Sequence, residues 1–119
     1  NVGVIVCPTA AISMRQLRPI NSPTHNCIAR VLELIKRKVP VLLGTDNIAN
    51  MYVPQSDGDM LTEIKLASHA VRFAIPYVWA KLGAGVPLNN VDRATVGRFL
   101  YQDRITFQEV GNGWKSAVE

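Results

Sequence analysis

The chain has 119 residues, of which 48% are hydrophobic and 18% are charged, and its formal net charge is +4. This length suits one domain and excludes a complete (β/α)₈ barrel, which needs about 250 residues. The mean hydropathy of +0.11 and the mixed charges argue against disorder. The only tight basic run, Lys36-Arg37-Lys38, suits the end of a helix, so we expect no nucleic-acid partner.

The apolar runs are only as long as strands, so we expect no membrane span, and no signal peptide is evident. Cys7 and Cys27 lie far apart in sequence and do not have the spacing of a zinc site. Two small buried thiols in a reducing compartment are the simplest interpretation, which predicts a cytoplasmic protein. The sequence leaves a disulfide between them open.

The first predicted strand is the β-branched run Val2–Cys7, which Pro8 stops and which is apolar on both faces, as in a parallel sheet covered by helices. Residues 9–24 are predicted as a loop. A helix should follow, with Ser22 as its cap and Pro23 at its first position. Its apolar face contains Ile28, Val31, Leu32 and Ile35, and Pro40 ends it.

The second predicted strand is Val41–Leu43, followed by the turn Gly44-Thr45-Asp46-Asn47. Ser56 and Asp59 resemble a capping box for a second helix. The apolar face of that helix contains Met60, Leu61, Ile64, Ala67, Val71 and Ala74.

The order strand, helix, strand, helix predicts an α/β fold with parallel strands and crossover helices. We expect a βαβα core over residues 1–82 and a helical extension over residues 83–119. The extension should hold a short helix over 77–82, a last helix from near Asp92, a short strand over 105–110 and a turn at Asn112-Gly113.

Asp46 is the residue that points most directly to chemistry, because it stands just beyond the carboxyl end of a predicted buried strand. Sites in α/β folds form at this end of the sheet. A carboxylate there can bind a divalent metal or accept a proton from a metal-bound water. On spacing alone, a carboxylate that caps the turn is the simpler interpretation.

Four segments, taken in order and spacing, resemble the last two βα units of the amidohydrolase superfamily, in its cytosine-deaminase-like branch. They are Val-Ile-Val-Cys-Pro-Thr at 4–9, His-Asn-Cys-Ile-Ala-Arg-Val at 25–31, Val-Leu-Leu-Gly-Thr-Asp-Asn at 41–47 and Pro-Gln-Ser-Asp-Gly-Asp-Met-Leu at 54–61. The resemblance implies part of a (β/α)₈ (TIM) barrel, made of two C-terminal βα units followed by short helices. It also implies that the chain is a C-terminal fragment of such an enzyme.

Members of this family are metal-dependent hydrolases that cleave C–N bonds. The resemblance implies that Asp46 contacts the metal, Zn or Fe in the parent enzyme, and shuttles a proton. It places Asn47 and Tyr52 at the substrate, where an aromatic ring can lie against a flat base. The end of the first strand, Cys7-Pro8-Thr9, would lie beside the site. The implied substrate is a small molecule, either a nucleobase-like heterocycle or a cyclic amide.

The chain also departs from the family pattern, which has four histidines on earlier strands. Only His25 and His69 are present, and neither matches a ligand position. Ala11 stands where relatives often have a polar residue. Lys38 stands where they often have glycine, which predicts a strained or differently ended helix.

We therefore expect the chain to be inactive alone and to need a missing N-terminal portion of the barrel, with no metal bound by the chain on its own. An alternative is a non-catalytic α/β protein, derived from such an enzyme, that forms homo-oligomers to cover the open sheet. A third interpretation, a phosphate- or nucleotide-binding protein, ranks last because no glycine-rich phosphate loop follows a strand.

Overall fold

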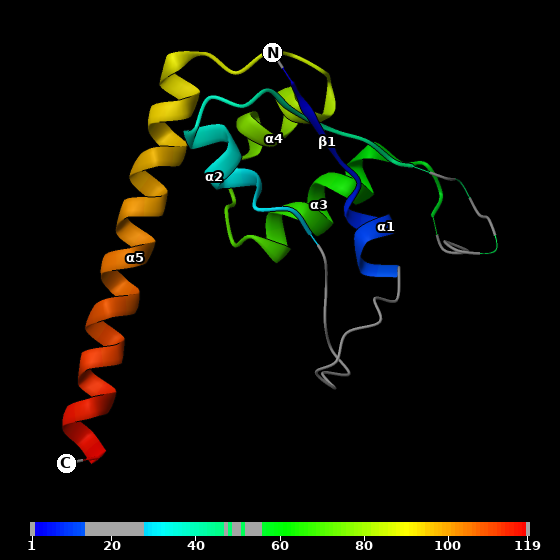
Figure 1. Ribbon diagram of the computed structural model, residues 1–119. Coiled ribbons are helices and arrows are strands. Elements are labelled where there is room, and N and C mark those ends of the chain that lie inside the picture. Colours follow the sequence, from blue (N-terminus) through cyan, green and yellow to red (C-terminus); the bar gives the residue numbers. More distant parts are fainter. Residues whose placement is uncertain (1, 14–27, 47, 49–50, 52–55, 119) are drawn as a thin grey trace.

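A computed structural model (Figure 1) describes residues 2–13, 28–46, 48, 51 and 56–118. The fold is mixed α/β and mostly helical, with a small parallel sheet. Its elements in chain order are β1 (Val4–Val6), α1 (Pro8–Ser13), α2 (Val31–Lys36), β2 (Val41–Leu43), α3 (Met60–Ala70), α4 (Pro76–Gly83) and α5 (Asn90–Val118).

The two strands pair in parallel, with Val4 opposite Val41 and Val6 opposite Leu43. The second predicted strand is confirmed, and the first is shorter than expected. One face of the sheet carries Val6, Val41 and Leu43, which are buried in a cluster with side chains of the helices. On the other face Ile5 is 68% exposed and Leu42 is 38% exposed. Within the described ranges, the expectation that helices cover both faces is therefore wrong.

Helix α1 corrects the predicted loop over residues 9–24, of which 14–24 lie outside the described residues. Pro8 occupies the first position of this helix, where its fixed φ is favourable and its missing N–H costs nothing. The Ala11 N–H donates to the carbonyl of Cys7 at 2.9 Å, which closes the first turn. Pro8 therefore begins a helix as well as ending a strand.

Helix α2 begins at Val31, and residues 28–30 before it are not helical. The predicted helix therefore does not continue unbroken through residues 28–30, and its predicted start at Ser22 and Pro23 lies outside the described residues. No side chain caps this short helix, and its three apolar residues, Val31, Leu32 and Ile35, are buried. Tertiary packing rather than capping therefore stabilises α2.

The end of α2 confirms the expectation for Lys38, whose φ is +61°. The Lys38 N–H donates to Ile35 and the Val39 N–H donates to Leu34, both at 3.0 Å. This pair of bonds is a Schellman motif, in which glycine normally takes the left-handed position. A lysine there adopts a backbone conformation that L-residues other than glycine, asparagine and aspartate rarely enter.

The second predicted helix is confirmed as α3, but it begins at Met60, three residues later than a cap at Ser56 would place it. Asp59 is the N-cap, and its carboxylate accepts the Leu61 N–H at 2.9 Å. The capping box headed by Ser56 is therefore wrong: Ser56 is buried and its hydroxyl lies 3.5 Å from the carbonyl of Thr45. The helix ends at Ala70 rather than reaching Ala74, with Arg72 in the left-handed region.

An aromatic cluster joins α4 and α5 to the segment after α3. The ring of Phe73 meets Trp79 with centroids 6.2 Å apart and Phe99 with centroids 5.0 Å apart, both edge to face. The indole N–H of Trp79 donates to the carbonyl of Phe73, so this large side chain is buried with its polar atom satisfied. The predicted helix over 77–82 is confirmed as α4.

The start of α5 is fixed by reciprocal hydrogen bonds. The Asn89 side chain accepts the Asp92 N–H, and the Asp92 carboxylate accepts the Asn89 N–H, both at 2.9 Å. The Lys81 ammonium of α4 lies 2.7 Å from the same carboxylate. Arg93 adds a hydrogen bond at 3.0 Å to the carbonyl of Ile35 in α2. Together these contacts tie α5 to α4 and α2.

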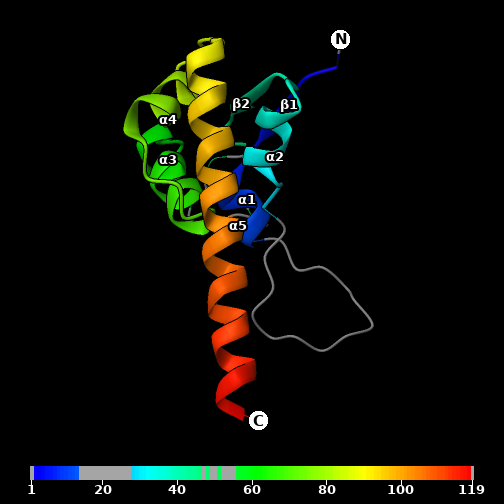
Figure 2. The same cartoon turned by 90° about the vertical axis from the view of Figure 1, so that its left-hand side faces the viewer.

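The second half of α5 extends past the other elements (Figures 1 and 2). The predicted strand over 105–110 and the turn at Asn112-Gly113 are therefore wrong, because this whole stretch is helical. Good helix formers such as Gln102, Arg104 and Glu109 favour the helix, and the Arg104 guanidinium lies over the ring of Tyr101 three residues earlier.

Candidate functional site

The two strands end at the same edge of the sheet, which we call the carboxyl edge and define by Cys7, Gly44 and Asp46. The register places Val6 opposite Leu43, so Cys7 and Gly44 leave the sheet side by side. The Gly44 N–H continues the ladder by donating to the carbonyl of Val6 at 2.9 Å. The topology thus brings together the two segments that the sequence singled out.

Gly44 allows these strand ends to lie close. A Cβ added at this position would stand 2.9 Å from Cγ2 of Ile5 and 3.2 Å from Sγ of Cys7. Contacts this short would require the side chain of Ile5 or Cys7 to move. A glycine at this position therefore allows Cys7 to lie close to the turn that carries Asp46.

Asp46 lies in this turn with an exposed side chain and a φ of +55°. Aspartate is one of the few residues besides glycine that tolerates this left-handed conformation. Within the described ranges, its carboxylate makes no hydrogen bond or ion pair. Residues 47, 49 and 50, whose N–H groups a turn cap would bind, lie outside the described residues, so the turn cap stays a prediction. Its backbone N–H instead donates to the thiol of Cys7. The carboxylate is open to solvent at the edge where the sequence placed it.

Cys7 is partly buried between two acidic groups. This burial raises the pKa of the Cys7 thiol, the charges of Asp46 and Glu63 raise it further, and the hydrogen bond from the Asp46 N–H opposes them. A thiol with a raised pKa stays protonated near neutral pH and is a weak nucleophile. The surroundings of Cys7 therefore argue against nucleophilic catalysis by this residue.

Glu63 is the residue at this edge that sequence reasoning missed. It belongs to α3, is 2% exposed and accepts the backbone N–H of Thr9 at 2.9 Å. The signal was present in the sequence, because position 63 lies on the same helical face as Met60 and Ala67. A charged residue on the apolar face of a predicted helix needs a buried partner, and Thr9 provides it.

The described residues do not make a metal site by themselves. Nowhere in ranges 2–13, 28–46 and 56–118 do three or more histidine, cysteine, aspartate or glutamate side chains converge in a way that could hold an ion. A zinc site usually needs three or four protein ligands, and Asp46 is the one exposed carboxylate at the carboxyl edge. A metal at this edge would need ligands from beyond the described part of the chain.

Several other predicted residues are not placed. Asn47 and Tyr52, the expected substrate contacts, lie outside the described residues, as do His25 and Cys27. His69 is described and is exposed on α3. Of the three predicted site residues, the structure therefore places only Asp46.

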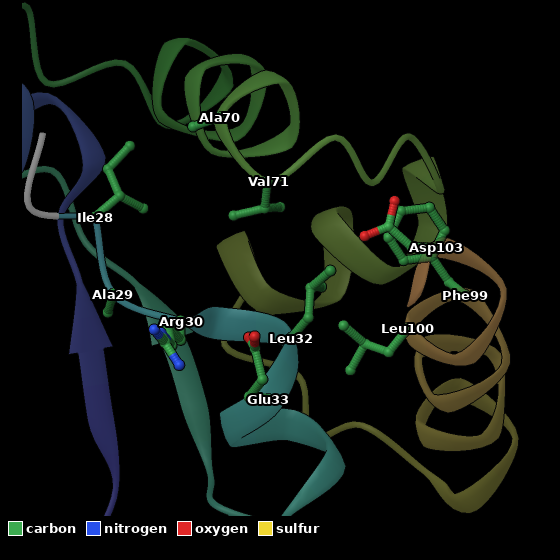
Figure 3. A pocket seen from close by; sticks show the side chains of 10 residues that line it. All are labelled: Ile28, Ala29, Arg30, Leu32, Glu33, Ala70, Val71, Phe99, Leu100 and Asp103. Atoms are coloured by element: carbon green, nitrogen blue, oxygen red, sulfur yellow. The ribbon is translucent and has the colours of Figure 1, made fainter. Parts of the chain in front are cut away.

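A separate pocket of about 230 Å³ lies between α2, the end of α3 and α5 (Figure 3). Leu32, Val71 and Phe99 form part of its apolar wall. Glu33 of α2 and Asp103 of α5 also line the pocket. Its volume is below the roughly 300–1,000 Å³ of typical ligand pockets. None of the predicted site residues lines it, so it is not the expected site.

No protein-family model, no curated protein and no solved structure matches this chain. Of the helices that the structure describes, none combines the length and apolar character needed to cross a membrane. The case for function therefore depends on the geometry of the carboxyl edge.

Proposed function

We propose that this chain is the C-terminal portion of a metal-dependent amidohydrolase or deaminase. The proposed reaction is hydrolysis of a C–N bond in a cytosine-like heterocycle or cyclic amide. In this proposal β1 and β2 are two strands of a (β/α)₈ barrel whose other strands lie outside the chain, and the protein works in the cytoplasm.

The observation that carries the proposal is the exposed Asp46 carboxylate at the shared end of two parallel strands. The loops that follow parallel strands meet at this end, and reacting groups are placed there in α/β enzymes. An aspartate buried in packed protein, away from the end of β1, would have contradicted the proposal. The contact between its backbone N–H and Cys7 instead brings it to that end.

The chain's own contribution is limited to the groups at this edge. A metal bound by the complete enzyme would supply Lewis-acid activation of water, but the described residues are too few to hold it. Asp46 is proposed as one of its ligands and as the acceptor, at a carboxylate oxygen, of the proton that water gives up. Asn47 and Tyr52 are proposed to contact the substrate.

The test compares the isolated 119-residue chain with the complete protein that contains it. We expect no hydrolysis of cytosine or a cyclic amide by the isolated chain. For the complete protein we expect metal-dependent release of ammonia or ring opening. The Asp46→Asn variant should lower kcat by a factor of about 10² to 10⁴, because it removes a proton acceptor.

Asparagine is the appropriate replacement because it also tolerates the left-handed φ of position 46. The matched control is Asp103→Asn, which changes an exposed carboxylate on α5 and should leave the rate unchanged. A complete protein that keeps its rate after Asp46→Asn would overturn the assignment of Asp46.

A second candidate function is self-association without catalysis, and the open face of the sheet favours it. Ile5 is 68% exposed and Leu42, opposite it on the paired strand, is 38% exposed, which is unusual for a parallel sheet. A second copy of the chain could cover these side chains. Size-exclusion chromatography with light scattering tests this candidate: a dimer whose population rises with concentration supports it, and a monomer at all concentrations contradicts it.

A further inference from the structure

Glu63 has no role in the proposed reaction, yet its carboxylate is among the most buried charged groups described. Glutamate is rarely buried unless it is hydrogen-bonded, since an unpaired charge in the interior is costly. Its Oε2 accepts the N–H of Thr9, which lies 54 residues earlier in the chain. This bond therefore connects α3 with the first turn of α1.

The bond satisfies a specific need of α1. The first N–H groups of a helix have no acceptor within the helix, and Pro8 has no N–H at all. Thr9 therefore offers the first N–H of α1, and Glu63 accepts it. A negative carboxylate is also favourable beside the positive end of the helix dipole.

The same turn carries Cys7, which leads from β1 into α1. Its sulfur accepts the backbone N–H of Asp46, so the turn is held on one side by α3 and contacts the Asp46 turn on the other. The absence of a Cβ at Gly44 is what allows the sulfur to lie this close to β2, since an added Cβ would stand 3.2 Å from it. A shift of the β1–α1 turn would therefore reach the backbone of Asp46.

We propose that Glu63 is a positioning residue of the carboxyl edge: it holds the Thr9 N–H and, through the turn that carries Cys7, fixes the backbone of Asp46. It is not a catalytic residue, because the residues it contacts are structural. For its effect on hydrolysis the inference rests on the proposed function, whereas its effect on the geometry of the edge does not.

The first experiment measures the geometry in the 119-residue chain by amide NMR. In Glu63→Ala, exchange of the Thr9 amide hydrogen should accelerate by about tenfold relative to Val39, since one hydrogen bond is lost. The amide resonances of Cys7 and Asp46 should shift. Glu63→Gln keeps an acceptor oxygen of the same reach, so its Thr9 exchange rate and its Cys7 and Asp46 resonances should be close to those of the wild type. Glu33→Ala, a change at an exposed glutamate in the first turn of α2, should move neither.

Two controls separate positioning from general stability. Val96→Ala removes buried side-chain atoms on α5 and lowers global stability, but it should leave the Cys7 and Asp46 resonances in place. If Glu63→Ala does not fold, Glu63→Asp takes its place, because its carboxylate is one methylene too short to reach Thr9. An unchanged Thr9 exchange rate, or a changed rate with unmoved Asp46, would overturn the proposal.

The second experiment measures kcat and KM of the complete protein. Glu63→Ala should lower kcat about tenfold or more with little change in KM, because a misplaced reacting group is costly, and Glu63→Gln should recover most of the loss. If Asp46→Asn abolishes hydrolysis while Glu63→Ala leaves kcat intact, the proposed function stands and the positioning role fails. If the NMR shifts appear but no hydrolysis is found, the role in edge geometry stands and the proposed function fails.

Discussion

The helical body, formed by α3, α4 and the first half of α5, contrasts with the carboxyl edge in how completely each is packed. In the body, Trp79 and Phe73 are about 1% exposed, and the indole N–H of Trp79 is hydrogen-bonded to the carbonyl of Phe73. At the edge, Asp46 is exposed in the turn after β2, and the strands that lead to the edge have three residues each, with Ile5 of β1 exposed. The difference indicates that the helices supply most of the stability, and that the chemically interesting groups are carried on a thin, half-covered sheet.

The largest expected loss of stability comes from a substitution in the core of the helical body. Trp79→Ala should cost about 3–5 kcal/mol, because it leaves a cavity and removes the ring contact with Phe73. Urea unfolding followed by circular dichroism measures this loss. Tyr101→Ala, at an exposed aromatic on α5, is the control and should change stability by less than about 0.5 kcal/mol. Equal losses in the two variants would mean that the aromatic cluster is not the core.

The next effect concerns the ion pair and hydrogen bonds of Asp92, which join α4 to α5. Burial would raise the pKa of the Asp92 carboxyl, but hydrogen bonds from Lys81 and the backbone of Asn89, with the charges of Lys81 and Arg93, outweigh burial and lower that pKa. A lowered folded-state pKa gives stability that is present above the ordinary value of 3.8 and is lost as the pH falls through the folded-state value. Asp92→Asn should therefore cost about 1.5–3 kcal/mol at pH 7 and less at pH 2.

The free energy of unfolding, measured at both pH values for the wild type and Asp92→Asn, tests this expectation. Asp103→Asn, on the exposed side of the same helix, serves as the control and should show the same pH dependence as the wild type. A loss from Asp92→Asn that is as large at pH 2 as at pH 7 would show that the carboxylate charge is not the cause.

The two faces of β1 give a matched pair of adjacent residues. Val6→Thr places a hydroxyl in the core and should cost about 1–2 kcal/mol, within the range for burying an unpaired hydroxyl. Ile5→Thr changes the exposed face and should leave stability within about 0.5 kcal/mol. If self-association covers that face, Ile5→Thr should also weaken the dimer seen by light scattering. A loss from Ile5→Thr as large as that from Val6→Thr would show that both faces are covered.

The smallest effect concerns the helix ends. Lys38, Arg72 and Gly85 all take a positive φ directly after a helix, but only Gly85 is free of steric strain there. Lys38→Gly should raise stability by about 0.5–1 kcal/mol, and Gly85→Ala should lower it by about the same amount. Thermal unfolding of the two variants measures both shifts, and opposite signs are required for the interpretation to hold.

Patterns within a few residues predicted the framework. The strand Val41–Leu43, the presence of the helix α3 and the approximate extent of α4 followed from apolar runs, spacing and proline. The errors came where a short segment is compatible with two different local structures. Pro8 fits both the end of a strand and the first position of a helix, and β-branched Ile105 and Val110 lie in a stretch that is otherwise favourable to helix.

The candidate site was predictable only in part, since it depends on contacts between distant segments. The place of Asp46 after β2 follows from the sequence, because parallel strands end at a common edge. The bond from Thr9 to Glu63 spans 54 residues, and no local pattern reveals such a pairing. The exposure of Ile5 was also not predicted, because its apolar character alone predicts burial.

Among the side chains of α5 that the structure describes, the buried ones lie in the first part of the helix. Asp92 and Val96 are buried and Phe99 and Leu100 are half-buried, whereas Tyr101 and most described side chains up to Gly111 are exposed. Backbone amides past Leu100 should therefore open by local fraying, without waiting for the domain to unfold. The cooperative folding unit of this protein accordingly includes only the first part of its longest helix.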